Sequence, residues 1–257
     1  LYFDPSVTYL APLKDKAARP GLSNYKKEGV HPQENITVYS LPPVLPFFYK
    51  FRWINKLNQR RMARFVRRKM REHGFTDVLL WVYSPVTADL VDLVPHKGLV
   101  YDCVDRHSAY GGLMDPALVD RMELELAGKT DRTFATADAL AERLRAAQPN
   151  TVMIPNGANF ERFVQAAQPQ PVPEDLRDIP HPIFGFVGAL QSCIEYDYLE
   201  AAAKARPDWS FVLIGKEKPG VDLTALHAMP NVHFLGLKPN EQLPQYLAHF
   251  DACLNLF

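Results

Sequence analysis

Short, continuous apolar runs alternate with helical patterns in the last third of the chain. The apolar runs cover residues 183–190, 209–214, 232–235 and 252–257. Apolar residues at helical spacing follow the first run, and a second helix is predicted over residues 241–249. Continuous apolar runs indicate strands that are buried on both faces, and their alternation with helices predicts a parallel sheet.

The carboxyl ends of these predicted strands carry small or basic residues. Gly188 ends the first run, Lys216 follows the second, and Gly236 follows the third. Ligands of open parallel sheets bind at this edge, and glycine and lysine there are suited to a phosphate-bearing ligand.

A second alternation fills the first part of the chain. Strands are predicted over residues 36–41, 77–83, 98–105, 132–136 and 151–155. Helices are predicted over 50–72, 115–126 and 139–147, the second opened by Asp115 as N-cap and Pro116 at the first helical position. This order again predicts a doubly wound parallel sheet.

Residues 158–182 separate the two alternations. They show no periodic pattern of apolar residues and contain five prolines, which indicates a semi-rigid linker. We therefore expect an α/β protein with two Rossmann-like, doubly wound parallel-sheet domains, residues 1–157 and 183–257. The second sheet is expected to be truncated at the last predicted strand, and the first residues resemble the tail of a strand that begins earlier.

Composition narrows the class of protein only slightly. Hydrophobic residues make up 47% of the chain, and no run of about 18 apolar residues predicts a membrane span. The three cysteines are unevenly spaced, and no cysteine and histidine cluster has the spacing of a zinc site, so buried or half-buried free thiols and no metal are expected.

The charge is unevenly distributed although the net charge is zero. Residues 50–72 contain ten Lys and Arg residues against one Glu, a net charge of +9 that leaves −9 for the remainder. Apolar residues in this segment follow helical spacing: Ile54, Leu57, Met62, Phe65, Val66 and Met70. The segment is either a core-facing helix with a solvated basic side, or a helix that meets anionic lipid or an anionic acceptor. No motif indicates nucleic-acid binding.

Six segments, taken in order, resemble retaining glycosyltransferase family four, which has the two-domain GT-B fold. The segments are residues 101–105 (YDCVD), 154–159 (IPNGAN, with Phe163), 186–189 (FVGA), 207–215 (PDWSFVLIG), 231–236 (NVHFLG) and 241–256. The first is similar to a branch that contains teichuronic-acid and capsule glycosyltransferases. Two glutamates that hold the donor in this family would lie beyond Phe257, so the fragment by itself is expected to be inactive.

The resemblance implies a nucleotide-diphosphate sugar as donor substrate and no other cofactor. Gly188 and Ala189 would bring main-chain N–H groups close to the diphosphate, Lys216 would reach its oxygens, and Gly236 with Leu237 would face the nucleobase. The basic residue usual in the first of these loops is not present, because residues 190–192 are Leu-Gln-Ser.

In the first domain, Asp105 ends a strand that is expected to open toward the cleft. Its carboxylate is a candidate to accept a hydrogen bond from a sugar hydroxyl or to act as base toward the acceptor, with His107 as a second catalytic candidate. The alternative is that Asp105 only caps a helix or forms a turn.

The sequence therefore predicts a hexosyl-type glycosyltransferase of bacterial envelope or capsule polysaccharide assembly, with a carbohydrate or lipid-linked acceptor. Its expected location is the cytoplasm, with residues 50–72 as a candidate contact to the inner face of the membrane. Two alternatives are a non-catalytic nucleotide-sugar-binding or scaffold protein, and a sugar-nucleotide epimerase with further catalytic acids and histidines near residues 102–107.

Overall fold

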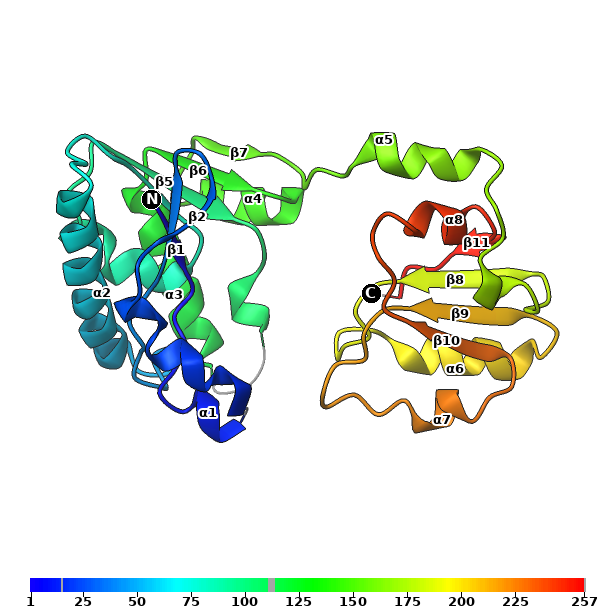
Figure 1. Ribbon diagram of the computed structural model, residues 1–257. Coiled ribbons are helices and arrows are strands. Elements are labelled where there is room, and N and C mark those ends of the chain that lie inside the picture. Colours follow the sequence, from blue (N-terminus) through cyan, green and yellow to red (C-terminus); the bar gives the residue numbers. More distant parts are fainter. Residues whose placement is uncertain (15, 111–113, 257) are drawn as a thin grey trace. The chain divides into compact units, whose positions relative to one another are not determined.

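The computed structural model describes residues 1–14, 16–110 and 114–256. Contacts divide the chain into two compact units, Leu1–Asn156 and Gly157–Phe257. Both units are α/β structures built around parallel strands, as Figure 1 shows. The predicted fold class, α/β with separate parallel sheets, is confirmed.

The first unit combines two sheets with four α-helices in its described residues. Its strands are β1 (Tyr2–Asp4), β2 (Val30–Gln33), β3 (Ile36–Ser40), β4 (Leu79–Val82), β5 (Gly98–Cys103), β6 (Arg132–Ala135) and β7 (Thr151–Met153). Its α-helices are α1 (Ala11–Lys14), α2 (Arg52–Glu72), α3 (Pro116–Lys129) and α4 (Asp138–Arg145). Short 3₁₀ helices cover Lys16–Leu22, Asn24–Lys26, Pro85–Asp89, Val91–Leu93 and His107–Ala109.

The larger sheet of this unit has the order β4-β5-β6-β7, and all neighbours are parallel. The smaller sheet has the order β1-β3-β2, in which β1 is parallel and β2 antiparallel to β3. The sequence did not predict β2, because its residues are exposed and include Pro32, so they show no apolar alternation. Asn35, with φ of 65°, makes the tight turn that joins β2 to β3.

The core of the first unit lies between β5 and the helices that pack on it. Leu99 and Tyr101 of β5 contact Met122 and Leu126 of α3 in one buried cluster. Asp115 is the N-cap of α3, since its Oδ1 accepts a hydrogen bond of 3.1 Å from the main-chain N–H of Leu118. The predicted cap is confirmed, and it sets where this core helix begins.

The basic helix α2 buries a different face from the one predicted at its N-terminal end. Leu57 is 44% exposed, whereas Asn55, Asn58 and Gln59 are buried. Their amides have specific partners that sequence spacing cannot indicate. Asn58 exchanges two hydrogen bonds with the main chain of Leu45, at 2.9 and 3.0 Å.

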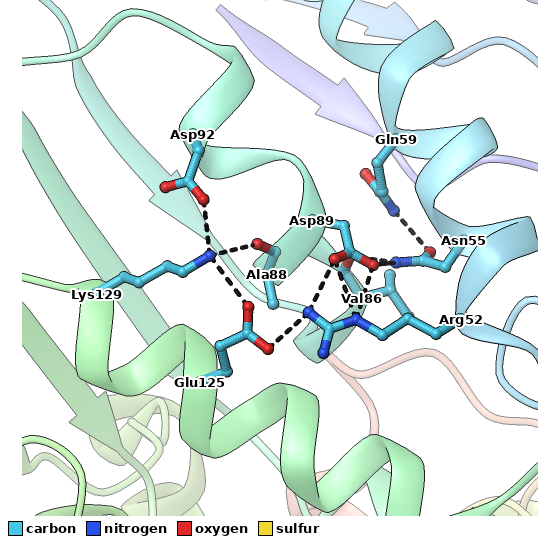
Figure 2. Close-up of polar contacts among 9 residues, drawn as sticks. All are labelled: Arg52, Asn55, Gln59, Val86, Ala88, Asp89, Asp92, Glu125 and Lys129. Carbon is cyan, nitrogen blue, oxygen red and sulfur yellow. Dashed lines mark hydrogen bonds and ion pairs between the residues drawn. The ribbon is translucent and has the colours of Figure 1, made fainter.

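A charged network fixes the first turns of α2 against neighbouring elements (Figure 2). The guanidinium of Arg52 contacts Asp89 at 2.9 Å and Glu125 of α3 at 2.6 Å. The ammonium of Lys129 contacts Asp92 at 2.7 Å and the same Glu125 at 3.2 Å. The hydrogen bond to Asp89 raises the pKa of Arg52 above its ordinary value. The network therefore joins α2 to α3 and to the 3₁₀ helices over residues 85–93.

The second unit is a single parallel sheet with helices on both faces. Its strands are β8 (Ile183–Val187), β9 (Ser210–Ile214), β10 (Val232–Gly236) and β11 (Ala252–Cys253), in the order β10-β9-β8-β11. Its helices are α5 (Phe160–Phe163), α6 (Tyr196–Ala205), α7 (Thr224–His227) and α8 (Leu243–Leu247), with 3₁₀ helices over Val164–Ala167 and Glu174–Leu176. One core cluster includes α6 and α7, and another includes α8, so each face has its own core, as Figure 1 also indicates.

Residues 158–182 are part of the second unit by their contacts. Leu176 is 2% exposed and packs in the same cluster as Ile183 and Tyr246. Asp175 accepts hydrogen bonds from Lys238 at 2.5 Å and from Tyr246 at 3.0 Å. The segment thus contains helical turns that its lack of periodicity did not indicate. The predicted limits of the domains and the linker remain a prediction.

The three cysteines form no disulfide within the described part of the chain. Cys103 is buried, whereas Cys193 and Cys253 are exposed, which corrects the expectation that all three lie at least half-buried. Both exposed thiols belong to the second unit: Cys193 lies between β8 and α6, and Cys253 is the last residue of β11. None of the described helices is long and apolar enough to cross a membrane.

Candidate functional site

The loops that follow β8, β9 and β10 are held together at one edge of the second sheet. The N–H of Gly188 donates to the carbonyl of Ile214 at 2.9 Å, and the N–H of Leu190 donates to the carbonyl of Lys216 at 3.0 Å. The N–H of Gly215 donates to the carbonyl of Gly236 at 2.9 Å. The structure therefore brings together the residues that the sequence assigned to a phosphate-bearing ligand in this unit.

Two glycines make this close approach of the loops possible. A Cβ atom on Gly215 would lie 1.8 Å from the carbonyl oxygen of Gly188, a distance at which no side chain fits. Gly236 has φ of 67°, in the left-handed region that residues with a Cβ rarely adopt. Both positions thus require glycine for the main-chain path rather than for a ligand contact.

The main-chain N–H of Ala189 is the better candidate for an anion contact in the first loop. The N–H of Gly188 already donates to Ile214, while Ala189 donates no hydrogen bond within the described residues. The helix α6 begins only at Tyr196, so neither residue lies in its first turn. A Cβ on Gly188 would also lie 2.9 Å from the ring of Phe186, so a larger residue there disturbs internal packing before it meets any ligand.

Lys216 is an exposed cation at this edge. Its ammonium has no hydrogen bond or ion pair to another described residue, and the same is true of Lys218. Glu217, which lies between them, pairs instead with His227 at 3.1 Å. Lys216 is therefore available to an anionic ligand, with a neighbouring lysine in the same loop for comparison.

One further side chain near this edge, that of Tyr196, had no signal in the sequence. The hydroxyl of Tyr196 is buried without a hydrogen-bond partner among the described residues. Burial, and then the neighbouring Cys193 and Glu217, raise the pKa of Tyr196. Leu237, assigned to the nucleobase, is 75% exposed at the end of β10, so its apolar side chain has no core to pack against.

In the first unit, the two catalytic candidates lie in one loop after β5. The carboxylate of Asp105 accepts hydrogen bonds from the N–H of Arg106 at 2.9 Å and from the hydroxyl of Tyr110 at 2.8 Å. His107 is buried, and its Nδ1 lies 3.1 Å from the carbonyl oxygen of Asp105, which therefore accepts a hydrogen bond from the Nδ1–H tautomer. That tautomer leaves Nε2 as an acceptor.

The exposed carboxylate of Asp105 does not cap a helix. The residue at the N-cap of the short 3₁₀ helix His107–Ala109 is Arg106, which makes no side-chain capping bond. Desolvation and the hydrogen bond to Asp105 raise the pKa of Tyr110 to about 12, so its hydroxyl stays protonated and donates. Asp105 is thus a carboxylate with two donors and an accessible remaining surface.

The comparisons with known proteins agree on the fold. The chain is 24% identical over 185 residues to the provisionally named teichuronic acid biosynthesis glycosyltransferase TuaH of Bacillus subtilis (strain 168), covering 67% of this chain and 46% of that protein. The sequence matches no model of a protein family.

Solved structures extend the likeness over most of the chain. Sucrose-phosphate synthase from Thermosynechococcus elongatus matches with a TM-score of 0.66 and 15% identity, over 88% of this chain and 61% of that one. Anabaena HepE, solved in complex with UDP and glucose, matches with a TM-score of 0.56 and 18% identity, over 84% and 59%. The predicted resemblance to GT-B glycosyltransferases is confirmed in the fold, and the chain spans about half to three fifths of the length of these relatives.

Proposed function

We propose that the protein is a glycosyltransferase that moves a sugar from a nucleotide-diphosphate donor to a carbohydrate or lipid-linked acceptor of a bacterial envelope or capsule. The observation that carries the proposal is the edge of the second sheet where Ala189, Lys216 and Gly236 meet around hydrogen-bonded loops. An unpaired lysine ammonium beside a free main-chain N–H offers two donors to diphosphate oxygens, whose negative charge grows as the sugar leaves. The proposal includes that the transferred sugar is a hexose and that its anomeric configuration is retained.

The similar proteins support a nucleotide sugar as the ligand of this edge. Anabaena HepE is described in complex with UDP and glucose, and Arabidopsis starch synthase IV with ADP and acarbose. In both, a nucleoside diphosphate accompanies a carbohydrate. A donor-hydrolysis assay on the whole protein separates the three functions considered. A glycosyltransferase releases free sugar and nucleoside diphosphate, a binding or scaffold protein gives no product, and an epimerase gives an isomerised nucleotide sugar.

Lys216→Ala is expected to weaken binding of UDP or ADP to the whole protein. The loss of one hydrogen bond to a charged group corresponds to about 1.5–3 kcal/mol. Lys218→Ala is the matched control, because Lys218 lies in the same loop, is also exposed, and is likewise unpaired within the described residues. Isothermal titration calorimetry measures the nucleotide affinity of both variants. Equal affinity of the two variants and the unchanged protein contradicts this position for the diphosphate.

We further propose that α2 contacts anionic lipid from the cytoplasmic side. Trp53 is 63% exposed and Leu57 44% exposed, on the same helix as the exposed basic residues. The basic side chains of α2 without a hydrogen bond or an ion pair to another described residue are Lys56, Arg60, Arg64, Arg67 and Arg71. Exposed aromatic and aliphatic side chains among arginines are typical of a helix that lies on a membrane surface.

Replacement of Arg60, Arg64, Arg67 and Arg71 by Glu is expected to abolish salt-sensitive binding to vesicles that contain phosphatidylserine. Each basic residue contributes up to about 1 kcal/mol at such a surface. The control replaces the same four residues by Lys, which keeps the charge. Vesicle co-sedimentation at low and high salt measures both proteins. If the Glu variant binds as well as the Lys variant, α2 is not the membrane contact.

A further inference from the structure

Exposed apolar side chains gather in the loop that precedes α2 and in the first turns of that helix. Five large apolar side chains are between 39% and 63% exposed there: Leu45, Phe47, Phe51, Trp53 and Leu57. None of the five lines the cavities of about 320 and 310 Å³ in the described part of the first unit. They therefore lie on the surface outside these cavities. We call these five side chains the apolar wedge.

The apolar wedge is not exposed for want of a core to join. Other apolar residues of the same loop turn inward. Val44 is 4% exposed, and Phe48 and Tyr49 pack against the main core cluster of the first unit. The loop thus divides its apolar residues into an inner set and an outer set. A contiguous outer set of large apolar side chains is typical of an interaction surface.

The loop holds the wedge in a fixed conformation. Phe47 has φ of 64°, in the left-handed region where a bulky residue is an outlier. The N–H groups of Lys50 and Phe51 both donate to the carbonyl of Phe47 at 2.9 Å. The buried amide of Asn58 fixes the main chain of Leu45 through its two hydrogen bonds. Backbone strain that the surroundings maintain is found mainly at functional positions, so it indicates a role for the exposed ring of Phe47.

Positive charge surrounds the apolar wedge. Residues 36–71 contain no Asp or Glu. Lys50, Lys56 and Arg60 are exposed and make no hydrogen bond or ion pair with another described side chain. The ammonium of Lys50 lies 5.8 Å from the centroid of the Phe51 ring. The apolar surface and the unpaired cations are therefore neighbours, which favours a partner that is both apolar and anionic.

We propose that the apolar wedge inserts into the headgroup and upper acyl region of an anionic bilayer, with Lys50, Lys56 and Arg60 on the lipid phosphates. The insertion deepens, and rests on, the proposed contact of α2 with lipid. Apolar burial and basic contacts together give an anchor that neither gives alone. Trp53 is the most exposed member at 63%, and an indole suits the boundary between water and acyl chains.

The charge of this surface favours a bilayer over a second copy of the chain. A symmetric contact between two copies would place the same basic residues against each other, and like charges repel. A bilayer that contains anionic lipids offers apolar chains and negative charge at once.

The wedge loop is also tied to the segment that follows the candidate catalytic loop. The carbonyl of Tyr49 accepts a hydrogen bond of 3.1 Å from the N–H of Asp115, the N-cap of α3. Insertion of the wedge would therefore hold this part of the first unit at the bilayer surface, where a lipid-linked acceptor is presented.

Trp53→Ser and Phe47→Gly in the whole protein test the insertion. Vesicles that contain phosphatidylserine are used at high salt, where the attraction of the basic residues is screened. We expect each variant to lower the partition coefficient about tenfold, the scale of burying one aromatic ring. Glycine adopts φ of 64° without strain, so Phe47→Gly keeps the path of the loop. Phe160→Ser is the control, because Phe160 is 75% exposed but lies in the second unit.

Fluorescence quenching measures the depth of insertion. Lipids with bromine on their acyl chains quench a tryptophan that reaches those chains. We expect quenching in the unchanged protein and its loss in Trp53→Phe, which keeps an aromatic ring in the wedge. Trp81 and Trp209 lie outside the wedge and remain in both proteins. Quenching that persists in Trp53→Phe overturns the insertion.

The outcomes separate the insertion from the proposed contact of α2. Binding of Trp53→Ser and Phe47→Gly equal to that of Phe160→Ser overturns the insertion. The contact of α2 still stands if replacement of its four arginines by Glu removes the salt-sensitive binding, and it fails as well if that replacement changes nothing. Self-association that is lost in Trp53→Ser while vesicle binding is unchanged assigns the surface to a second copy and also overturns the insertion.

Discussion

Glu123→Leu is expected to lower the free energy of unfolding of the first unit by about 3–5 kcal/mol, the cost of removing one partner from a buried ion pair. Glu123 is 0% exposed. Its carboxylate pairs with Arg143 and accepts hydrogen bonds from the hydroxyl of Tyr101 at 2.5 Å and the thiol of Cys103 at 3.3 Å. Without the carboxylate, the hydroxyl of Tyr101 loses its acceptor, and the guanidinium of Arg143 loses its buried partner and keeps the contact with Asp120 at 3.4 Å.

The protonation of these neighbours explains why they depend on Glu123. Burial, and then the charge of Glu123, raise the pKa of Tyr101 above its ordinary value and that of Cys103 to about 12. Both groups therefore stay protonated at neutral pH and donate to the carboxylate. The cluster joins β5, α3 and α4, so we expect its loss to destabilise the first unit as a whole.

Urea unfolding followed by tryptophan fluorescence measures the effect. Trp209→Phe is used as the background in every protein, so that Trp53 and Trp81 report on the first unit alone. The control is the double variant Glu123→Leu with Arg143→Met, which removes both charges. It should recover part of the lost stability, because an apolar pair of similar volume replaces the ion pair. A loss below about 1 kcal/mol in Glu123→Leu contradicts the expectation, since that is the range of exposed pairs.

Asp105→Asn is expected to lower the turnover of the whole protein by about 10²-fold or more, with unchanged affinity for the nucleotide, if Asp105 acts as base or stabilises charge on the sugar. Asn keeps the shape of the side chain and the oxygen that accepts from the N–H of Arg106. It removes the negative charge. Since a carboxylate is repelled by a diphosphate, its role is expected on the sugar or the acceptor rather than on the nucleotide.

Tyr110→Phe separates this role from a structural one. It removes the hydrogen bond of 2.8 Å that Asp105 accepts from Tyr110 and leaves the carboxylate in place. If Asp105 only organises its loop, both variants should lose similar stability, about 0.5–1.5 kcal/mol, with turnover per folded molecule intact. Initial rates, nucleotide affinity and melting temperature of both variants distinguish the catalytic role of Asp105 from the structural one. Equal turnover of Asp105→Asn and the unchanged protein rules out a catalytic carboxylate at this position.

The sequence alone was sufficient for the parallel strands and for the start of α3. The largely apolar run over residues 209–214 predicts β9, because a strand covered on both faces is apolar at most positions of either face. Asp115 and Pro116 predicted the first turn of α3 since a cap and its target N–H are only three residues apart. The glycines at the strand ends also marked the loops that meet at the edge of the second sheet.

The tertiary structure decided the features whose partners are distant in the sequence. Asn58 is buried because the main chain of Leu45 satisfies its amide, while Leu57 beside it remains exposed. No local pattern reveals such a partner. The same reason applies to β2, which has only exposed residues and exists because β3 pairs with it.

The candidate site also combines features that the sequence predicted with features that only the tertiary structure determined. The sequence identified Gly188, Lys216 and Gly236 one by one, from their places after strands. Only the structure showed that the N–H of Gly188 is already used by Ile214, which leaves Ala189 as the free donor, and that Gly215 is needed where two loops nearly touch. Residue types and their spacing along the chain predict elements and loop ends, whereas the choice of hydrogen-bond partner depends on which main-chain groups the fold brings within about 3 Å.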